Sequence, residues 1–167
     1  MSQQILIAAC LAFGLSAALV AGVFQSFSDF IMRGLASVQG SGGMASMQAI
    51  NVTVINSWFL RFFIALAPLS VVFALYAVWG MEGRALVAVV LAAAIYVPFS
   101  FVVTLFGNVP MNNALADLPS GTAQASEYWT HYYRRWTQFN TLRTWASAVA
   151  AACYFYAAVV LAGQGAA

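Results

Sequence analysis

Four long apolar runs without a charged residue dominate the hydropathy pattern of this chain. They cover residues 5–24, 62–79, 85–106 and 144–161. A helix rises 1.5 Å per residue, so about 20 residues cross the roughly 30 Å of bilayer hydrocarbon. Backbone polar groups in lipid must pair within the segment or within a closed barrel, and these runs lack the two-residue alternation of barrel strands. The pattern therefore predicts an all-α, polytopic membrane protein, a four-transmembrane-helix bundle formed by residues 1–167 as a single membrane domain.

The segments between the predicted spans differ greatly in length. Residues 80–84 link the second and third spans by a tight turn, whereas the other two connections are each about 30 to 40 residues long. Both long connections lie on the membrane face opposite the tight turn, and both carry aromatic and amide side chains at helical spacing. We therefore predict two long helical connections on one face and expect the function to reside there.

Arginines are distributed unequally between the two membrane faces. Only Arg84 flanks the tight turn, whereas five arginines flank the long connections: Arg33, Arg61, Arg134, Arg135 and Arg143. Because positive charges favour the cytoplasmic side, this bias places the long connections in the cytoplasm and both termini on the same, outer side. Residues 1–4 lack the Lys or Arg of a signal peptide, so we expect the first span to be retained.

The segment that leads into the fourth span separates two kinds of side chain when it is placed on a helix. One face is basic, with His131, Arg134 and Arg135, and suits contact with lipid headgroups. The opposite face is aromatic and resembles an interfacial belt. The aromatic face carries Trp129, Tyr133, Trp136, Asn140 and Arg143. Asn140 and Arg143 continue into the fourth span, where polar groups are costly unless they face protein or water. This pair predicts a functional site or polar network, with structural tethering as the alternative.

The first long connection places two amides ahead of the second span. Gln48 and Asn51 share one face with Trp58 on a helix that we expect to continue into that span. Earlier in the connection, Asp29 and Arg33 are four residues apart and predict a local ion pair. Asp29 is also the acidic side chain nearest the membrane core, so it remains a candidate general base.

The end of the third span predicts an interrupted helix. Pro110 lacks a backbone donor and disfavours helical geometry in the preceding residue. We therefore expect a break around residues 107–109, with Asn108 capping the restarted helix. A break at this depth must border protein or water, so Asn108 and Asn112 are the amides expected to face the bundle interior.

Composition excludes several classes of protein. Charged residues make up 6% of the chain, against about 25% in soluble domains, and the mean hydropathy is +0.87. This composition predicts that membrane lipids surround the protein. The net charge is only +2 and the basic residues form no stripe, so we expect no nucleic acid as a partner. One His and four scattered acids cannot build a bis-His haem or di-iron site, so we expect no metal and no cofactor. A pocket of aromatic, amide and guanidinium groups suits a flat, lipophilic aromatic small molecule.

Four blocks of sequence occur in the order of the spans: FSDFIMRGL, MQAIN, NVPMNNAL and YWTHYYRRWTQFNTLRT. Together they resemble the anthrone-oxygenase-like family of small four-helix membrane proteins. That family is named after fungal anthrone oxygenases of polyketide pathways, and most bacterial-type members have no assigned reaction. We expect an integral protein of a bacterial inner (cytoplasmic) membrane. The resemblance implies that the family's motif positions are occupied by Gln48, Asn51, Asn108, Asn112, Trp136, Asn140 and Arg143.

Two functions from different classes stay open. The first is metal-free oxygenation of an anthrone-like or other polycyclic phenol, with Asn140 and Arg143 stabilising an oxyanion and Asp29 as the candidate base. The expected substrate-binding residues are Gln48, Asn51, Trp58, Asn108, Asn112, Trp129, Tyr133 and Trp136. The alternative is non-enzymatic: a membrane subunit that holds a lipid, quinone or pigment for a partner protein.

Overall fold

The computed structural model describes residues 2–164, and every regular element in this range is helical. The prediction of an all-α fold is confirmed. Some turns are π-helical, which means wider than an α-helix, and are labelled η. The elements are α1 (Gln3–Ser26), η1 (Phe27–Ile31), α2 (Met32–Ser37), α3 (Gly42–Val54), α4 (Trp58–Gly80), α5 (Gly83–Tyr96), η2 (Val97–Val102), η3 (Thr104–Asn108), α6 (Val109–Ala116) and α7 (Ala123–Gln164).

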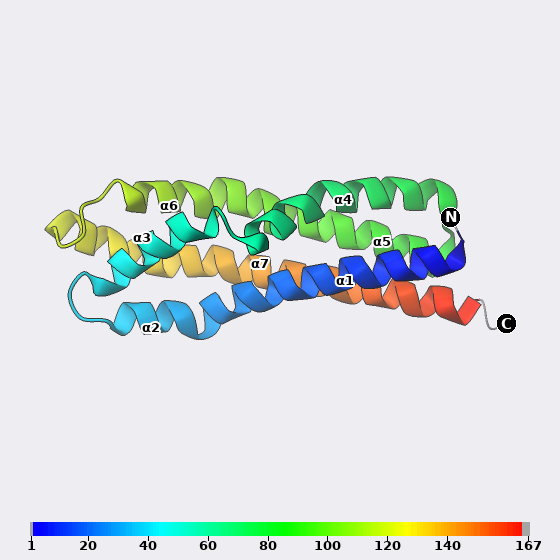
Figure 1. Ribbon diagram of the computed structural model, residues 1–167, viewed down its shortest axis with the longest axis horizontal. Coiled ribbons are helices and arrows are strands. Elements are labelled where there is room, and N and C mark those ends of the chain that lie inside the picture. Colours follow the sequence, from blue (N-terminus) through cyan, green and yellow to red (C-terminus); the bar gives the residue numbers. More distant parts are fainter. Residues whose placement is uncertain (1, 165–167) are drawn as a thin grey trace.

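Four long helical columns make up the bundle (Figure 1). One column runs from Gln3 to Ser37, a second is α4, a third runs from Gly83 to Ala116, and the fourth is α7. All four are long and apolar enough to cross a membrane, and each contains one predicted span. The start of α1 and the end of α7 lie at one end of the bundle, and α2, α3 and α6 lie at the other. The four-span architecture with two long helical connections at one end is therefore confirmed.

α7 is about twice as long as the hydrocarbon core is thick. Its 42 residues cover about 63 Å, against roughly 30 Å of hydrocarbon. The first half of α7 therefore continues beyond the predicted fourth span, where it packs against α2 and α6, and α3 lies across α2 and α6. We call this part of the protein, residues 27–57 and 107–143, the extension.

Two separate groups of buried side chains form the interior. The membrane core lies among α1, α4, α5 and α7, and small residues such as Ala17, Ala92 and Ala150 let its helices approach closely. The extension core consists of Met32, Met44, Met47, Leu115, Ala125, Tyr132 and Trp136. The two cores give the membrane half and the extension their own packing.

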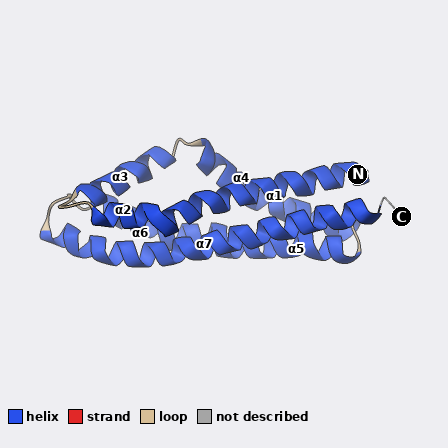
Figure 2. Ribbon diagram, turned by 90° about the horizontal axis from the view of Figure 1, so that it is seen from below, coloured by secondary structure: helices blue, strands red, loops and turns tan. Residues whose placement is uncertain are grey.

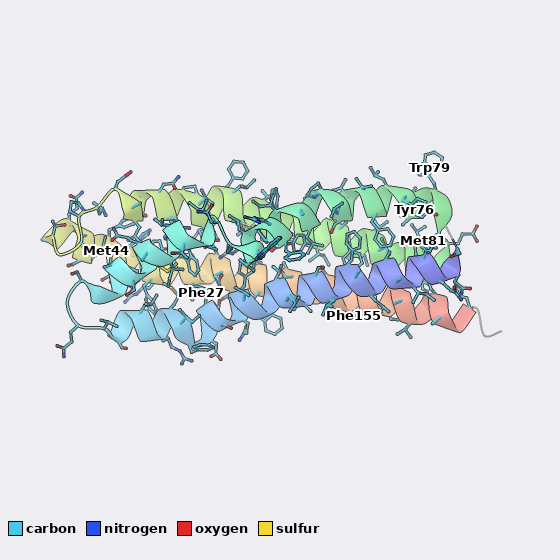
Figure 3. The ribbon with its side chains drawn as sticks, in the orientation of Figure 1. Phe27, Met44, Tyr76, Trp79, Met81 and Phe155 are labelled. Atoms are coloured by element: carbon cyan, nitrogen blue, oxygen red, sulfur yellow. The ribbon has the colours of Figure 1, made fainter. Side chains whose placement is uncertain are left out.

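The outer surface of the membrane half is apolar. Leu19, Val72 and Val159 are each more than 60% exposed, as expected for side chains that face lipid. Figure 3 shows Trp79 pointing away from the bundle at the turn between α4 and α5, far from Met44 in the extension. An exposed tryptophan at this end is typical of a side chain at a membrane surface.

The break expected near Pro110 is absent, and that prediction is wrong. Asn108 has helical dihedral angles (φ −76°, ψ −41°), and its side chain caps nothing. The column instead widens into η2 and η3 ahead of this proline. A proline ring crowds the carbonyl four residues earlier, and a wider turn gives that carbonyl more room. The chain therefore passes Pro98 and Pro110 as one continuous column.

The helix expected to run from the first long connection into the second span is interrupted, so this prediction is also wrong. α3 ends at Val54, and Ser57 caps α4 by accepting a hydrogen bond from the Leu60 N–H at 3.1 Å. A serine hydroxyl stabilises a helix start in this way and competes with a continuous helix. Residues 55–57 form an elbow that stands away from the other helices in Figure 2. Trp58 consequently leaves the face of Gln48 and is 72% exposed.

α2 and α3 approach each other most tightly at Gly43. A Cβ atom at this position would lie 1.9 Å from the backbone oxygen of Leu35. No side chain fits at that distance, so glycine is required by the close approach rather than by its dihedral angles. The contact fixes α3, and the side chains that it carries, against α2.

Candidate functional site

A cavity of about 300 Å³ lies at the junction of the membrane core and the extension core. Most of its wall is apolar and includes the rings of Phe24, Phe27, Phe59 and Phe63. The polar groups of the wall are Gln48, Asn51, Thr104, Asn108, Asn112, Asn113, Asn140 and Arg143. A largely apolar pocket with a few convergent polar groups is typical of a small-molecule site. Because Phe24, Phe63 and Thr104 stand at the ends of predicted spans, the cavity lies at the membrane boundary.

Among the described residues that line this cavity, Arg143 alone carries an ionisable side chain. It is 4% exposed. Its Nη1 donates to Thr104 Oγ1 at 3.1 Å, and its Nη2 donates to Asn140 Oδ1 at 2.6 Å. The guanidinium carbon lies 4.1 Å from the ring centre of Phe24 and 5.3 Å from that of Trp136. The guanidinium is therefore held by neutral oxygens and aromatic faces.

Asn140 connects this guanidinium to α1. Its Oδ1 accepts from Arg143, and its Nδ2 donates to the Phe24 oxygen at 2.6 Å and to Ser28 Oγ at 2.7 Å. Thr141 also bonds to Ser28 Oγ, at 2.9 Å. Ser28 lies in η1, so the wide turn of the first column presents its hydroxyl to α7. Asn140 thus uses both ends of its amide and fixes the orientation of Arg143.

Asn112 organises the aromatic wall of the cavity. Its Oδ1 accepts from Trp136 Nε1 at 2.8 Å and from the Tyr132 hydroxyl at 2.9 Å. Asn51 Nδ2 donates to the same hydroxyl at 3.5 Å, which is a long hydrogen bond. Side chains of α3, α6 and α7 therefore meet in one network beside the cavity.

Two further amides hold backbone groups. Asn108 Nδ2 donates to the Trp136 oxygen at 3.3 Å. Gln48 Nε2 donates to the oxygens of Leu115 and Leu118 at 2.8 and 3.0 Å. These carbonyls lie at and just beyond the end of α6, where helix carbonyls lack partners within the helix. Gln48 thus ties α3 to the end of α6.

The cavity brings together most of the candidate residues selected from the sequence, namely Gln48, Asn51, Asn108, Asn112, Trp136, Asn140 and Arg143. Asp29, Trp58, Trp129 and Tyr133 do not line it. The Asp29 carboxylate is 58% exposed and pairs with Arg33 at 2.9 Å on the surface, away from where a base would act. Trp129 and Tyr133 pack against the extension core, and Trp129 stacks on Tyr132 with 5.6 Å between ring centres.

The sequence did not select three residues that bond to this site: Thr104, which accepts from Arg143, Ser28, which accepts from Asn140, and Tyr132. Only Tyr132 lies on the helix face already analysed. It is fully buried and bonded to Asn112. At 100° per residue it lies about 40° from Trp136 and about 60° from Trp129 on the helix. A face centred on Trp136 and Arg143, rather than on Trp129, includes Tyr132 and leaves out Tyr133. Tyr132 could have been selected from the sequence by continuing the buried face of the fourth span toward the N-terminus of the same helix.

Fold and cavity together define a class of protein. It is a helical membrane protein with four spans and, at the membrane boundary, an apolar pocket that holds a buried guanidinium beside amide side chains. The family model for anthrone oxygenase matches residues 55–153, which is more than half of the chain. The chain therefore belongs to the anthrone oxygenase family, and the resemblance seen in the sequence blocks is confirmed. No curated protein and no solved structure matches the chain.

The matched range contains Asn108, Asn112, Trp136, Asn140 and Arg143, whereas Gln48 and Asn51 precede it. Within residues 2–164, no group of three or more His, Cys, Asp or Glu side chains is arranged to hold a metal ion. The expectation of a site without a metal or cofactor stays a prediction.

Proposed function

We propose that the protein oxygenates a lipophilic polycyclic phenol of the anthrone type, and that the cavity around Arg143 is its active site. Membership of the anthrone oxygenase family supports the reaction class. The observation that carries the proposal is a buried guanidinium beside aromatic rings at the end of the spanning region. This position suits a flat, lipid-soluble molecule with an oxygen that becomes negatively charged.

The reaction balances with O₂ as the only co-reactant. An anthrone has a ring methylene opposite a ketone, and loss of one methylene proton gives an anion whose charge is shared with the ketone oxygen. The carbanion passes an electron to O₂, and the two radicals combine into a carbon–peroxide bond. Loss of the second C–H proton with cleavage of the O–O bond leaves a carbonyl and water. The four electrons of the methylene thus reduce both oxygen atoms.

The cavity residues divide this work between them. Arg143, oriented by Asn140, stabilises the oxyanion, and removal of one such donor typically costs about 10² to 10³ in rate. The rings of Trp136 and Phe27, whose centres are 5.7 Å apart and whose planes are tilted by 57°, each offer an aromatic surface against which the substrate can pack. Asp29 has no part in this proposal because its carboxylate is exposed and paired with Arg33.

Anthrone turnover tests the proposal. The protein purified in mild detergent and treated with a chelator is expected to convert anthrone to anthraquinone in air, consuming equimolar O₂. Arg143→Gln should lose this activity. Arg135→Gln is the matched control, because Arg135 is exposed and lies over the Phe139 ring outside the cavity. Turnover no faster than spontaneous oxidation in empty micelles, or equal loss in both variants, contradicts the proposal.

A ligand-binding subunit without catalysis is the second candidate. The observation that favours it is the lack of any Asp, Glu, His, Lys or Cys among the described residues that line the cavity. Extraction in mild detergent followed by mass spectrometry separates the two functions. A stoichiometric small molecule that persists under O₂, or a protein partner in fixed ratio, favours the subunit. A ligand that is consumed favours the oxygenase.

We also propose that the protein lies in a bacterial inner membrane with its extension in the cytoplasm. Arg33, Arg134 and Arg135 are exposed on the extension, whereas only Arg84 lies at the opposite end. In a background without Cys10 and Cys153, an impermeant maleimide applied to intact cells is expected to label Glu82→Cys. Ser120→Cys, in the exposed loop after α6, should react only after lysis. The reverse pattern would invert the orientation.

A further inference from the structure

The guanidinium of Arg143 has no negatively charged partner in the described part of the protein. The chain has four acidic residues, all of them exposed, and none lines the cavity: Asp29, Glu82, Asp117 and Glu127. The rings of Phe24 and Trp136 and the hydrogen bonds to Thr104 and Asn140 offset part of the cost of burying a charge, but all four are neutral. A buried cation in such surroundings favours an anionic ligand.

Two residues that line the cavity each have one buried polar atom without a hydrogen-bond partner among residues 2–164. These atoms are Arg143 Nε, which is a donor, and Asn108 Oδ1, which is an acceptor. Asn108 is 1% exposed and Arg143 is 4% exposed. Unpaired groups at such burial are costly. A ligand that presents a charged oxygen to Nε and a hydroxyl to Oδ1 satisfies both.

The cavity also offers no group to take a proton from its ligand. Among the described residues, the titratable side chains that interact with the charge of Arg143 are Tyr96 of α5 and Tyr132 of α7. The Tyr96 hydroxyl donates to the Phe63 oxygen at 3.2 Å, and the Tyr132 hydroxyl donates to Asn112 Oδ1 at 2.9 Å. Both phenols therefore keep their protons in bonds to protein acceptors.

We propose that the cavity takes its ligand as a preformed anion, a ring-shaped phenol or enol that has already lost one proton and keeps a second, neutral hydroxyl for Asn108. This inference deepens the proposed function and rests on it for the ring-shaped body of the ligand. In the step only an O–H bond breaks, its proton passes to water or a buffer base outside the cavity, and no electron is transferred. The protein selects the charged form and does not remove the proton itself.

A β-hydroxyanthraquinone is a suitable probe, because it has no methylene to oxygenate and its colour changes when the phenol ionises. Bound to the purified protein in detergent, it is expected to show the phenolate spectrum about 1 to 3 pH units below the range needed in empty micelles. This shift corresponds to a roughly 10- to 1000-fold preference for the anion. Below the phenol's own titration range, binding should release a proton to the buffer. The methyl ether of the probe should bind weakly and independently of pH.

Thr104 provides variants that test the charge itself. Its Oγ1 lies 3.1 Å from Arg143 Nη1, so Thr104→Asp places a carboxylate beside the guanidinium, whereas Thr104→Asn adds similar bulk without charge. The Asp variant is expected to bind the probe at least about 10-fold more weakly and without the spectral shift. The Asn variant controls for the added bulk: it should lose much less affinity than the Asp variant and should still show the spectral shift. Asn108 is tested by a second hydroxyl on the probe. A dihydroxy probe should bind more tightly than the monohydroxy probe, and Asn108→Leu should abolish this difference in affinity between the two probes.

The possible results separate this inference from the proposed function. Binding of the neutral phenol without proton release, or equal affinity for the probe and its methyl ether, overturns the inference and leaves oxygenation intact. A probe bound as phenolate by a protein that does not oxidise anthrone overturns oxygenation and supports the inference. If Thr104→Asp fails to fold, the probe spectrum and the proton release measured with the natural protein still test whether the ligand binds as an anion.

Discussion

Arg143→Met is expected to lower anthrone turnover about 10²- to 10³-fold while leaving the protein at least as stable as the natural chain. Methionine fills much of the arginine stem's volume without a charge, so the burial penalty of an unpaired ion, several kcal/mol, disappears. The losses are no larger than this gain. Asn140 Oδ1 loses a donor at about 1 to 3 kcal/mol, and the contact with Phe24 is worth roughly 2 kcal/mol. Thr104 keeps its hydrogen bond to the Ser100 oxygen.

Thermal unfolding measures the stability of Arg143→Met, and anthrone turnover of the same preparation measures its activity. Arg135→Met is the matched control, because its guanidinium is exposed and its loss should change neither quantity. Arg143→Lys separates charge from geometry: a single ammonium cannot reproduce the fork that reaches Thr104 and Asn140, so its turnover should stay well below that of the natural protein. A clear drop in the unfolding temperature of Arg143→Met with unchanged turnover would show an arginine with a purely structural role.

Gly43→Ala is expected to destabilise the extension by about 1 to 3 kcal/mol or more. The new Cβ would lie 1.9 Å from the backbone oxygen of Leu35, and no side-chain rotation can relieve a clash with backbone. α3 must therefore move away from α2, and it takes Gln48 and Asn51 with it. The variant should combine a lower unfolding temperature with faster proteolysis in the turn at residues 38–41 and weaker retention of the ligand.

Gly34→Ala is the matched control for this clash. Gly34 lies in α2, where a Cβ would meet nothing within 4 Å. Because alanine is the better helix former, this variant should be more stable by roughly 0.5 to 1 kcal/mol. Equal behaviour of the two alanine variants would mean that the close approach of α2 and α3 does not hold the extension together.

The architecture was accessible from the sequence because lipid imposes a simple physical requirement. A span needs a long apolar run without charge, and the four runs read from the chain each fall within one helical column. Asn140 and Arg143 were also accessible, because polar groups at the start of a span must face protein or water. The cost of exposing an amide or a guanidinium to lipid explains why both side chains lie in the cavity.

The elbow and the wide turns were not accessible from helical periodicity. An idealised helix assumes about 100° per residue, and each π-helical turn inserts an extra residue that rotates all later side chains by about that angle. η2 and η3 therefore change which face Asn108 and Asn112 present. At the elbow, the Ser57 cap competes with a continuous helix, and α3 packs on α2 and α6, which helical periodicity does not predict.

The elbow between α3 and α4 is the place where we expect the cavity to exchange its ligand. Val52 and Ile55 belong to the cavity wall, yet they are 67% and 64% exposed. Wall residues that also face outward indicate an opening. We infer that it faces the boundary between headgroups and hydrocarbon, because the elbow directly precedes the second predicted span. We then expect exchange with molecules dissolved in the bilayer. The relevant concentration is the mole fraction of substrate in the lipid, so adding inert lipid or detergent slows turnover even when the amount of substrate per volume is unchanged.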